Sequence, residues 1–485
     1  MFYKLKWHTM FRSYGDIGYL IYQRSPYDID RVVNDVGAVF LSLLSYEPLE
    51  ISELVQQASD IFAGVSIQEL KRDMIEFYDD LQKEGFLDFG NSFDECSQKK
   101  DEFSYLISQE KLIDSIVYKD VGKRFGTQEY LEQYFSENPK LLKFQVEITN
   151  VCNERCVHCY IPHAMKNFSM EPEMYYQILR EVGEMGVVSF GISGGEPMLH
   201  PNFLEFVQEA QKLSINITIL TNLTLLKKEY IEAFKKGRIT IIASLYSLVN
   251  EHHDKITQVP GSCEKTKLAI QTLLENNIPV QINCPLMKDN ENDFVELVRW
   301  AKTKNIMVRT DYCLIARCDG SSDNLENRID IEHMQVIIDE LTEENTYFKK
   351  LISADDYEEQ CSILYNDQNG HWCGVGYTCC SVDAYGNVLP CPSWSDFSAG
   401  NVHEKSLTEI WLTSEKFKYI RALTKKDFKK CVNCQEQAYC SVCMARNANE
   451  SNSHDPLEVN EYFCKIAEMN RKSVEKWRNE NIKGH

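Results

Sequence analysis

Long hydrophobic runs are missing from this chain. No stretch reaches the about 18 uninterrupted apolar residues that a membrane-spanning helix needs. The first residues, Met1–Phe11, contain no apolar segment of the kind found in secretory signals. We therefore expect a cytoplasmic protein with no membrane partner.

Positive charge is also scarce. The 52 lysines and arginines are outnumbered by 73 aspartates and glutamates, which gives a formal net charge of −21. Nucleic-acid phosphates are bound by clustered lysine and arginine. We expect no nucleic-acid partner, and the acidity itself is most simply explained by solubility.

Cysteine is nearly absent from the first 150 residues, where Cys96 stands alone, yet ten of the eighteen cysteines lie between Cys361 and Cys464. A cytosolic chain keeps its thiols reduced, so a disulfide scaffold is not expected. Metal binding explains a regional concentration of thiols better.

Three cysteines, Cys152, Cys156 and Cys159, form a C-x3-C-x2-C loop directly after the strand-like run Phe144–Thr149. Three thiolates holding a [4Fe–4S] cluster leave one iron open to a small molecule. A zinc knuckle or a purely structural loop is the alternative interpretation.

Between residues 143 and 340, apolar strands alternate with amphipathic helices. The expected strands are Phe144–Thr149, Val187–Ser193, Asn216–Thr221, Ile239–Leu245, Val280–Pro285 and Met307–Tyr312. The expected helices are Glu173–Met185, Asn202–Leu213, Lys228–Lys235, Cys263–Asn276 and Asn292–Lys304. This pattern predicts an α/β fold with a parallel sheet, a partial (β/α)6 TIM-like barrel. Such barrels carry their chemistry at the carboxyl ends of the strands, where the cysteine loop begins.

The second expected strand ends in Ser193-Gly194-Gly195-Glu196-Pro197. Two glycines allow close approach of the backbone to a ligand. Taken alone, the segment is typical of an ordinary turn. One strand–helix unit after the cysteine loop, it resembles the signature of the radical S-adenosylmethionine (SAM) superfamily.

That resemblance implies that the open iron chelates SAM and that reductive cleavage yields a 5′-deoxyadenosyl radical. By position, it implies a cofactor site made of Tyr160, Gly194, Gly195, Glu196, Pro197, Asn222, Ser244, Asn283 and Arg309. An arginine that some relatives carry after the fourth strand has no counterpart in His253–Thr257.

The tail, residues 341–485, has little periodicity, and we expect it to be loop-rich apart from a final helix over Ile466–Lys483. Its cysteine spacing resembles the SPASM domain, with two residues rather than the usual three before Cys443. The resemblance implies an outer [4Fe–4S] cluster on Cys431, Cys434, Cys440 and Cys464, and an inner one on Cys373, Cys391 and Cys443. Cys379 or Cys380 could complete the inner set, or neither, which would leave an iron open to a substrate thiolate. Zinc again remains an alternative.

Another cysteine, Cys318, lies in a loop expected at the barrel mouth. Cys284 and Cys313 fall on expected strands, where a free cysteine is usually a small core residue. We therefore single out Cys318 as the candidate catalytic thiol.

The first 90 residues predict a separate winged-helix module: strands Phe2–His8 and Gly18–Gln23, helices Asp35–Leu44, Ile51–Ile61 and Ser66–Glu84, and a returning strand, Gly85–Phe89. The order of elements resembles the leader-binding recognition element of enzymes that mature ribosomally made peptides. Such modules add a peptide strand to a sheet edge. A packing or dimerisation domain is the alternative. Residues 91–142 are expected to form a linker with one or two helices.

Together these resemblances imply a peptide maturase that forms thioether crosslinks in a leader-bearing precursor, with three [4Fe–4S] clusters, SAM and an electron donor such as flavodoxin or ferredoxin. Carbon–carbon crosslinking is the next hypothesis, because the same clusters and cofactor serve both reactions. A sulfatase-maturating, formylglycine-forming enzyme and a non-enzymatic electron carrier are the further alternatives.

Overall fold

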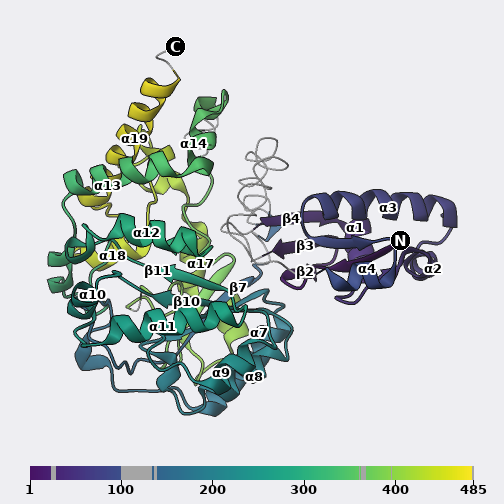
Figure 1. The fold of residues 1–485 in the computed structure, drawn as a ribbon, viewed down its shortest axis with the longest axis horizontal. Helices are drawn as coiled ribbons and strands as arrows, with labels where there is room; N and C mark the ends of the chain where they lie inside the picture. The colour runs from purple at the N-terminus through teal and green to yellow at the C-terminus, as the bar shows by residue number, and fades with distance from the viewer. Residues whose placement is uncertain are drawn as a thin grey trace. The chain divides into compact units, whose positions relative to one another are not determined.

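The structure is a computed structural model that describes residues 1–22, 29–99, 131, 134–135, 139–359, 361, 368–394 and 396–482. The chain divides into two compact units. One comprises Met1–Leu131 with Ser214–Asn216, and the other comprises Glu132–Leu213 and Ile217–His485 (Figure 1). None of the described helices is both long and apolar enough to cross a membrane.

The N-terminal unit contains two antiparallel sheets, with strand orders β5-β1-β6 and β2-β3-β4. Its strands are β1 (Phe2–Leu5), β2 (Thr9–Ser13), β3 (Ile17–Tyr22), β4 (Ile29–Asn34), β5 (Leu49–Glu50) and β6 (Leu87–Gly90). Its helices are α1 (Asp35–Ser42), α2 (Ile51–Ile61), α3 (Ile67–Lys83) and α4 (Phe93–Gln98). The three helices and the returning strand lie where the sequence predicts them. Most of the expected linker, 91–142, lies outside the described residues.

Strands β2 and β4 were not expected from the sequence. Their residues, Thr-Met-Phe-Arg-Ser and Ile-Asp-Arg-Val-Val-Asn, show no sustained alternation of apolar and polar side chains. Both pair with β3 along their length, so the cross-strand partner, not the local pattern, determines them.

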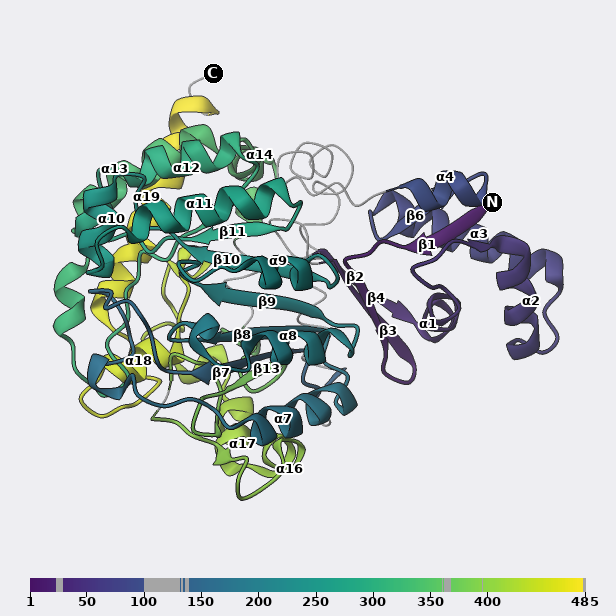
Figure 2. The ribbon, with the colours of Figure 1, turned by 60° about the horizontal axis from the view of Figure 1, so that its bottom comes forward.

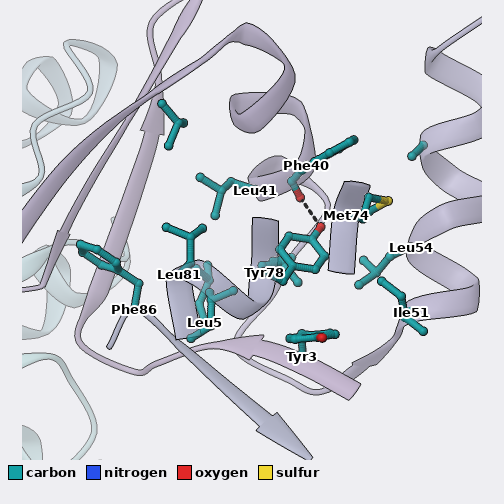
Figure 3. Packing of buried hydrophobic residues seen from close by; sticks show 14 of the residues in the cluster. Tyr3, Leu5, Phe40, Leu41, Ile51, Leu54, Met74, Tyr78, Leu81 and Phe86 are labelled. Carbon is teal, nitrogen blue, oxygen red and sulfur yellow. Dashed lines mark hydrogen bonds between the residues drawn. The ribbon is translucent and has the colours of Figure 1, made fainter. Parts of the chain in front are cut away.

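The core of this unit lies between its helices and β1 (Figure 3). Helix α3 buries one residue roughly every turn, at Leu70, Met74, Tyr78 and Leu81. The Tyr78 hydroxyl donates a hydrogen bond of 2.7 Å to the Phe40 carbonyl, so the one polar atom of this buried ring is satisfied.

The second unit is built on a nine-stranded sheet of order β12-β11-β10-β9-β8-β7-β13-β14-β15. Six parallel strands form its first part: β7 (Lys143–Thr149), β8 (Ser189–Gly194), β9 (Asn216–Thr221), β10 (Ile239–Ser244), β11 (Val280–Asn283) and β12 (Met307–Arg309). Figure 2 shows β8, β9, β10 and β11 side by side. The predicted α/β class with a six-stranded partial barrel is confirmed.

Helices follow most strands of the barrel: α7 (Pro172–Glu184), α8 (Phe203–Gln211), α9 (Lys228–Phe234), α10 (Asn250–Thr257), α11 (Ser262–Glu275), α12 (Phe294–Thr303), α13 (Ile331–Glu344) and α14 (Thr346–Ser353). Five of these coincide with predicted helices, whereas α10, α13 and α14 were not predicted. The sequence of α10, Asn-Glu-His-His-Asp-Lys-Ile-Thr, offers too few apolar positions to reveal its period.

The cysteine-rich tail is more ordered than the sequence suggests. Strand β13 (Cys379–Val382) pairs parallel to β7, and β14 (Asn387–Leu389) and β15 (Gly400–Asn401) continue the sheet in antiparallel fashion. The described residues after β15 form the helices α16 (Leu407–Thr413), α17 (Glu415–Ala422), α18 (Met444–Glu450) and α19 (Glu461–Asn481). The tail therefore extends the barrel sheet and does not merely follow it.

Candidate functional site

The cysteine loop after β7 is held by backbone hydrogen bonds to the end of α10. The amide of Arg155 donates to the Thr257 carbonyl at 2.9 Å, and the amide of Val157 donates to the Ile256 carbonyl at 3.0 Å. A third bond joins the loop to the end of β8, from the Glu196 amide to the Val151 carbonyl at 2.9 Å. These bonds attach the loop to the end of α10 and to the end of β8.

The two glycines after β8 are required by a close approach of two strand ends. A Cβ at Gly194 would lie 2.0 Å from the Thr149 carbonyl oxygen, and one at Gly195 would lie 2.4 Å from that of Val151. Gly194 also has a φ of +143°, which disfavours other residues. The predicted Gly194-Gly195 pair thus lets the second strand end touch the cysteine loop.

Glu196 is fully buried, and its carboxylate points into the protein. One oxygen accepts from the Met198 amide at 3.0 Å, and the other from the Asn222 amide at 2.7 Å. The Thr221 hydroxyl contacts both oxygens, at 2.8 and 3.0 Å. Burial raises the pKa of Glu196 to about 7, against the effect of these donors. The carboxylate joins the ends of β8 and β9, and its role in the cofactor site stays a prediction.

The three cysteines of the loop influence one another electrostatically. Burial raises the pKa of Cys152 to about 11 and holds that of Cys156 well above its usual value, with Cys152 and Cys159 among the further causes for Cys156. Thiols in such surroundings stay protonated unless a metal replaces the proton.

This donor set fits an iron–sulfur cube. Three thiols share one short loop, and the apolar side chains of Ile256, Met287 and Leu314 pack around Cys156. Within the described ranges, no three cysteine, histidine, aspartate or glutamate side chains converge at the spacing of ligands to a single metal ion. A cube binds each cysteine through a different iron, so its ligands stand farther apart than those of a tetrahedral ion.

The remaining predicted cofactor residues lie on the same edge of the sheet, because they end or follow parallel strands. Asn222 is bonded to Asn153 of the cysteine loop at 2.9 Å. The hydroxyl of Tyr160 donates to Glu147 at 2.6 Å, and burial, opposed by this bond, raises the pKa of Glu147 to about 7. Pro197 begins a 3-10 turn. Each of the three remaining predicted residues is the last residue of its strand: Ser244 and Asn283 are half-buried, and Arg309 is exposed.

In the tail, the structure brings the four predicted outer ligands together. Burial raises the pKa of Cys440 to about 12, and the neighbouring thiols that add to the effect include Cys431, Cys464 and Cys434. Burial likewise raises the pKa of Cys431 to about 11, with Cys434 and Cys464 next in effect.

The predicted inner ligands form a second group. Burial raises the pKa of Cys391 to about 11, and the thiols of Cys443 and Cys373 add to the effect. Cys379 and Cys380 lie on β13 and so point to opposite sides. Cys379 packs against the apolar cluster that Cys391 and Cys443 also contact, whereas Cys380 is 3 % exposed and its thiol interacts with Arg421. The same cluster also includes Cys431 and Cys440 of the outer group, and Cys380 interacts electrostatically with Cys379, so the fourth inner ligand stays a prediction.

Cys318 lies next to the first cysteine loop. Its amide donates to the carbonyl of Tyr160 at 2.9 Å, one residue after Cys159. The predicted mouth loop therefore approaches the loop that would hold the first cluster.

Sequence reasoning missed four side chains around Cys156. Glu154 places a carboxylate oxygen 3.5 Å from its sulfur, and its other oxygen is buried and has no hydrogen-bond partner among the residues that the structure describes. Lys166 acts electrostatically on Cys152, Cys156 and Glu154. The Tyr246 hydroxyl lies 3.9 Å from the Cys156 sulfur, and His253 stacks on the Tyr246 ring. Glu154 lies between the first two cysteines, so its position was the one available signal.

Two family models match the chain. Residues 146–301 match the Radical SAM superfamily, and residues 373–436 match SPASM, an iron–sulfur cluster-binding domain.

Among curated proteins, the chain is 28% identical over 348 residues to the antilisterial bacteriocin subtilosin biosynthesis protein AlbA of Bacillus subtilis, covering 69% of this chain and 74% of AlbA. It is 25% identical to an AdoMet-dependent heme synthase of Methanosarcina barkeri, over 64% of this chain and 92% of that protein. It is also 24% identical to the sporulation killing factor maturation protein SkfB of Bacillus subtilis, over 55% of this chain and 63% of SkfB.

Solved structures share the fold. SuiB of Streptococcus suis, bound to precursor peptide SuiA, aligns with a TM-score of 0.61 at 18% identity, covering 94% of this chain and 99% of SuiB. The protein anSMEcpe, with AdoMet and the Cp18Cys peptide, aligns with a TM-score of 0.54 at 17% identity, over 70% of this chain and 98% of that one.

Proposed function

We propose that this chain, a radical SAM enzyme with a SPASM domain, modifies a ribosomally made precursor peptide. A radical SAM domain binds SAM and a [4Fe–4S] cluster, and a SPASM domain binds auxiliary iron–sulfur clusters. The observation that carries the proposal is the extent of the likeness to SuiB, which includes the N-terminal unit, together with the relationship to AlbA.

We assign the first cluster to Cys152, Cys156 and Cys159, which leaves one iron free for SAM. The outer auxiliary cluster belongs to Cys431, Cys434, Cys440 and Cys464. The inner one belongs to Cys373, Cys391 and Cys443, with Cys379 as fourth ligand, since Cys379 packs against the apolar cluster that Cys391 and Cys443 also contact and Cys380 is not part of that cluster.

When bound, the cluster and SAM supply a radical that takes a hydrogen atom from a substrate carbon. The chain's residues position that cofactor. The backbone around Gly194 and Gly195 lies against the cysteine loop, and Pro197 fixes the turn that follows. We assign the other contacts to Tyr160, Glu196, Asn222, Ser244, Asn283 and Arg309, at or near the same strand ends.

We further propose that the product is a thioether between a precursor cysteine and a carbon. Forming this bond removes one hydrogen atom from the carbon, the proton of the thiol and one more electron. The inner auxiliary cluster is the acceptor we propose for that electron, and a flavodoxin or ferredoxin supplies the electron that starts each turnover. Cys318 lies beside the first cysteine loop, and we assign it as the catalytic thiol that acts on the substrate.

The N-terminal unit is the part that we assign to the precursor's leader. Strands β2 and β4 are the outer strands of their sheet within the described residues. An ion pair between Arg31 and Glu84 brings β4 to the end of α3. A leader strand added to β4 would lie along that helix.

Anaerobic incubation of the reduced enzyme with SAM and its precursor tests the proposal. We expect 5′-deoxyadenosine and a peptide that is lighter by two hydrogens per crosslink. One cysteine per crosslink should no longer react with an alkylating reagent. A peptide lighter by two hydrogens with all thiols still alkylated indicates carbon–carbon crosslinking. Turnover of SAM with no change in peptide mass would contradict both.

Two other substrates follow from specific relatives. The structure of anSMEcpe with AdoMet and the Cp18Cys peptide has the same fold with a peptide bound, which is compatible with the sulfatase-maturating alternative, a reaction that would give an aldehyde. The heme synthase relatives support a porphyrin substrate, but they cover 64% of this chain. Both matches leave about a third of the chain without a counterpart, and a leader-binding unit would explain part of that remainder.

A further inference from the structure

A tyrosine hydroxyl lies against one sulfur of the first cysteine loop. Tyr246 follows β10 by two residues, and its hydroxyl is 3.9 Å from the sulfur of Cys156. Both residues are buried, at 5 % and 8 % exposure. This distance is within the hydrogen-bond limit for sulfur. In a buried, apolar setting a hydrogen bond is stronger than it is in water.

The ring of Tyr246 is held from several sides. His253 stacks on it with ring centres 5.2 Å apart and planes at 22°, and His158 meets it edge-on at 4.9 Å. The amide of Tyr246 donates to Nδ1 of His253 at 3.1 Å. Its carbonyl accepts from Asn290 at 3.0 Å. The hydroxyl therefore has little freedom to leave the sulfur.

The direction of this hydrogen bond follows from chemistry. A cysteine that binds iron is a thiolate, which accepts hydrogen bonds and has none to donate. The Ser244 hydroxyl hydrogen bonds to Tyr246, so the phenol can accept from Ser244 while its own proton points to Cys156.

We propose that Tyr246 donates a hydrogen bond to the Cys156 thiolate of the bound cluster and thereby raises the reduction potential of that cluster. The added electron of the reduced cluster is shared with its thiolates, and a hydrogen bond to sulfur stabilises this charge. Tyr246 is thus a positioning residue. The inference rests on the proposed ligand role of Cys156.

A second group near the Cys156 sulfur, the carboxyl of Glu154, acts on the reduction potential in the direction opposite to Tyr246. Glu154 presents a carboxylate oxygen to the same sulfur at 3.5 Å. The ionised form of this carboxyl disfavours the added electron, whereas the phenol favours it. Removing the phenol leaves Lys166 as a group that still favours the added electron but takes away the hydrogen bond to the sulfur, so the variant should shift to more negative potential.

Tyr246→Phe in the anaerobically purified holoenzyme is the test, followed by EPR-monitored redox titration. The first cluster is recognised as the signal that changes when SAM is added. We expect unchanged iron content and a reduction equilibrium constant at least tenfold lower, a shift of about 59 mV to more negative potential for one electron. Tyr175→Phe is the matched control, because that buried hydroxyl donates to the Phe206 carbonyl at 2.9 Å.

A potential unchanged in Tyr246→Phe, with full iron and a SAM-sensitive signal, would overturn the inference and leave the proposed function intact. Loss of that signal in Cys156→Ala is what the proposed function requires, and its persistence there would overturn the ligand assignment instead. If Tyr246→Phe does not retain iron, resonance Raman spectra of the wild-type enzyme in H2O and D2O decide the matter. A deuterium shift of the iron–thiolate bands supports the hydrogen bond, and its absence contradicts it.

Discussion

The Thr221 hydroxyl contacts both carboxylate oxygens of Glu196, at 2.8 and 3.0 Å, and so joins the ends of two neighbouring strands below the Gly194-Gly195 turn. Both side chains are buried. A buried carboxylate depends on its donors more than an exposed one does, because no water replaces a lost partner.

Thr221→Val should therefore destabilise the enzyme. Valine keeps the shape but removes the hydroxyl, and an under-satisfied buried carboxylate costs about 1–3 kcal/mol. The midpoint of thermal unfolding and SAM affinity should both fall. Thr218→Val, on the same strand at a half-buried position, is the control and should change neither. Equal stability of the two variants would show that Thr221 does not support Glu196.

Glu196→Gln tests the raised pKa of this carboxyl. Burial raises the pKa of Glu196 to about 7 from an ordinary value near 4.5, so the fold favours the protonated form. The stability from this preference is fully present below pH about 4.5 and is lost as pH rises to about 7. Glutamine stays neutral, so the wild type should lose on the order of 3 kcal/mol relative to the variant across this range.

Melting temperatures of both proteins from pH 5 to pH 8 provide the measurement. Glu468→Gln is the control. A hydrogen bond from Lys472 lowers the pKa of Glu468, which is therefore ionised throughout the range. The difference in melting temperature between Glu468→Gln and the wild type should therefore stay constant. A constant gap for Glu196→Gln as well would argue against a raised pKa.

The barrel was predictable because its strands are short and rich in apolar residues, and because five of its helices have a clear 3.6-residue period. Its first and second strands end in motifs whose residue types are dictated by chemistry, three thiols and two glycines. The glycines show the limit of that reasoning. The sequence indicated a close approach to a ligand, whereas the structure shows contact with the Thr149 and Val151 carbonyls.

The parts that escaped prediction depend on partners distant in sequence. Strand β13 exists because β7 offers an edge about 230 residues earlier, and no local pattern announces that pairing. Tyr246 looks like a core aromatic until Cys156 is placed beside its hydroxyl. Short strands such as β13, and side-chain contacts such as that of Tyr246 with Cys156, are determined by the tertiary fold. Sequence periodicity therefore does not predict them.

The pair Cys379 and Cys380 allows a direct test of the inner cluster. Cys379→Ala should lower the iron content by up to about four atoms per chain or yield a partly degraded cluster, since a [4Fe–4S] cluster would lose its fourth protein ligand. Cys380→Ala should keep full iron and only lower stability, because it leaves a small cavity beside Arg421. Iron analysis and Mössbauer spectra compare the two. The reverse pattern would assign Cys380 as the ligand, and full iron in both would leave the inner cluster with an open site.

Cys318→Ala separates radical formation from product formation. The substitution keeps the backbone amide that donates to the Tyr160 carbonyl, so the variant should still produce 5′-deoxyadenosine. We expect crosslinked peptide to fall at least tenfold, measured by mass spectrometry against SAM cleavage in the same sample. Cys318→Ser should behave like alanine, since a hydroxyl is a poor substitute for a thiolate. Normal coupling in both variants would remove Cys318 from the reaction.

Leader binding by strand addition makes a prediction about the precursor itself. Successive residues of a strand point their amides alternately toward and away from the neighbouring strand. Methylating one leader amide at a time should therefore weaken binding at every second position, by about 1 kcal/mol or more for each lost hydrogen bond. Fluorescence anisotropy of labelled leaders with the full-length enzyme measures this. The same methylations in the part of the precursor that becomes crosslinked serve as the control and should leave leader affinity unchanged. Losses without the two-residue period would mean that the N-terminal unit holds the leader through side chains, and no loss at any leader position would remove this unit from precursor recognition.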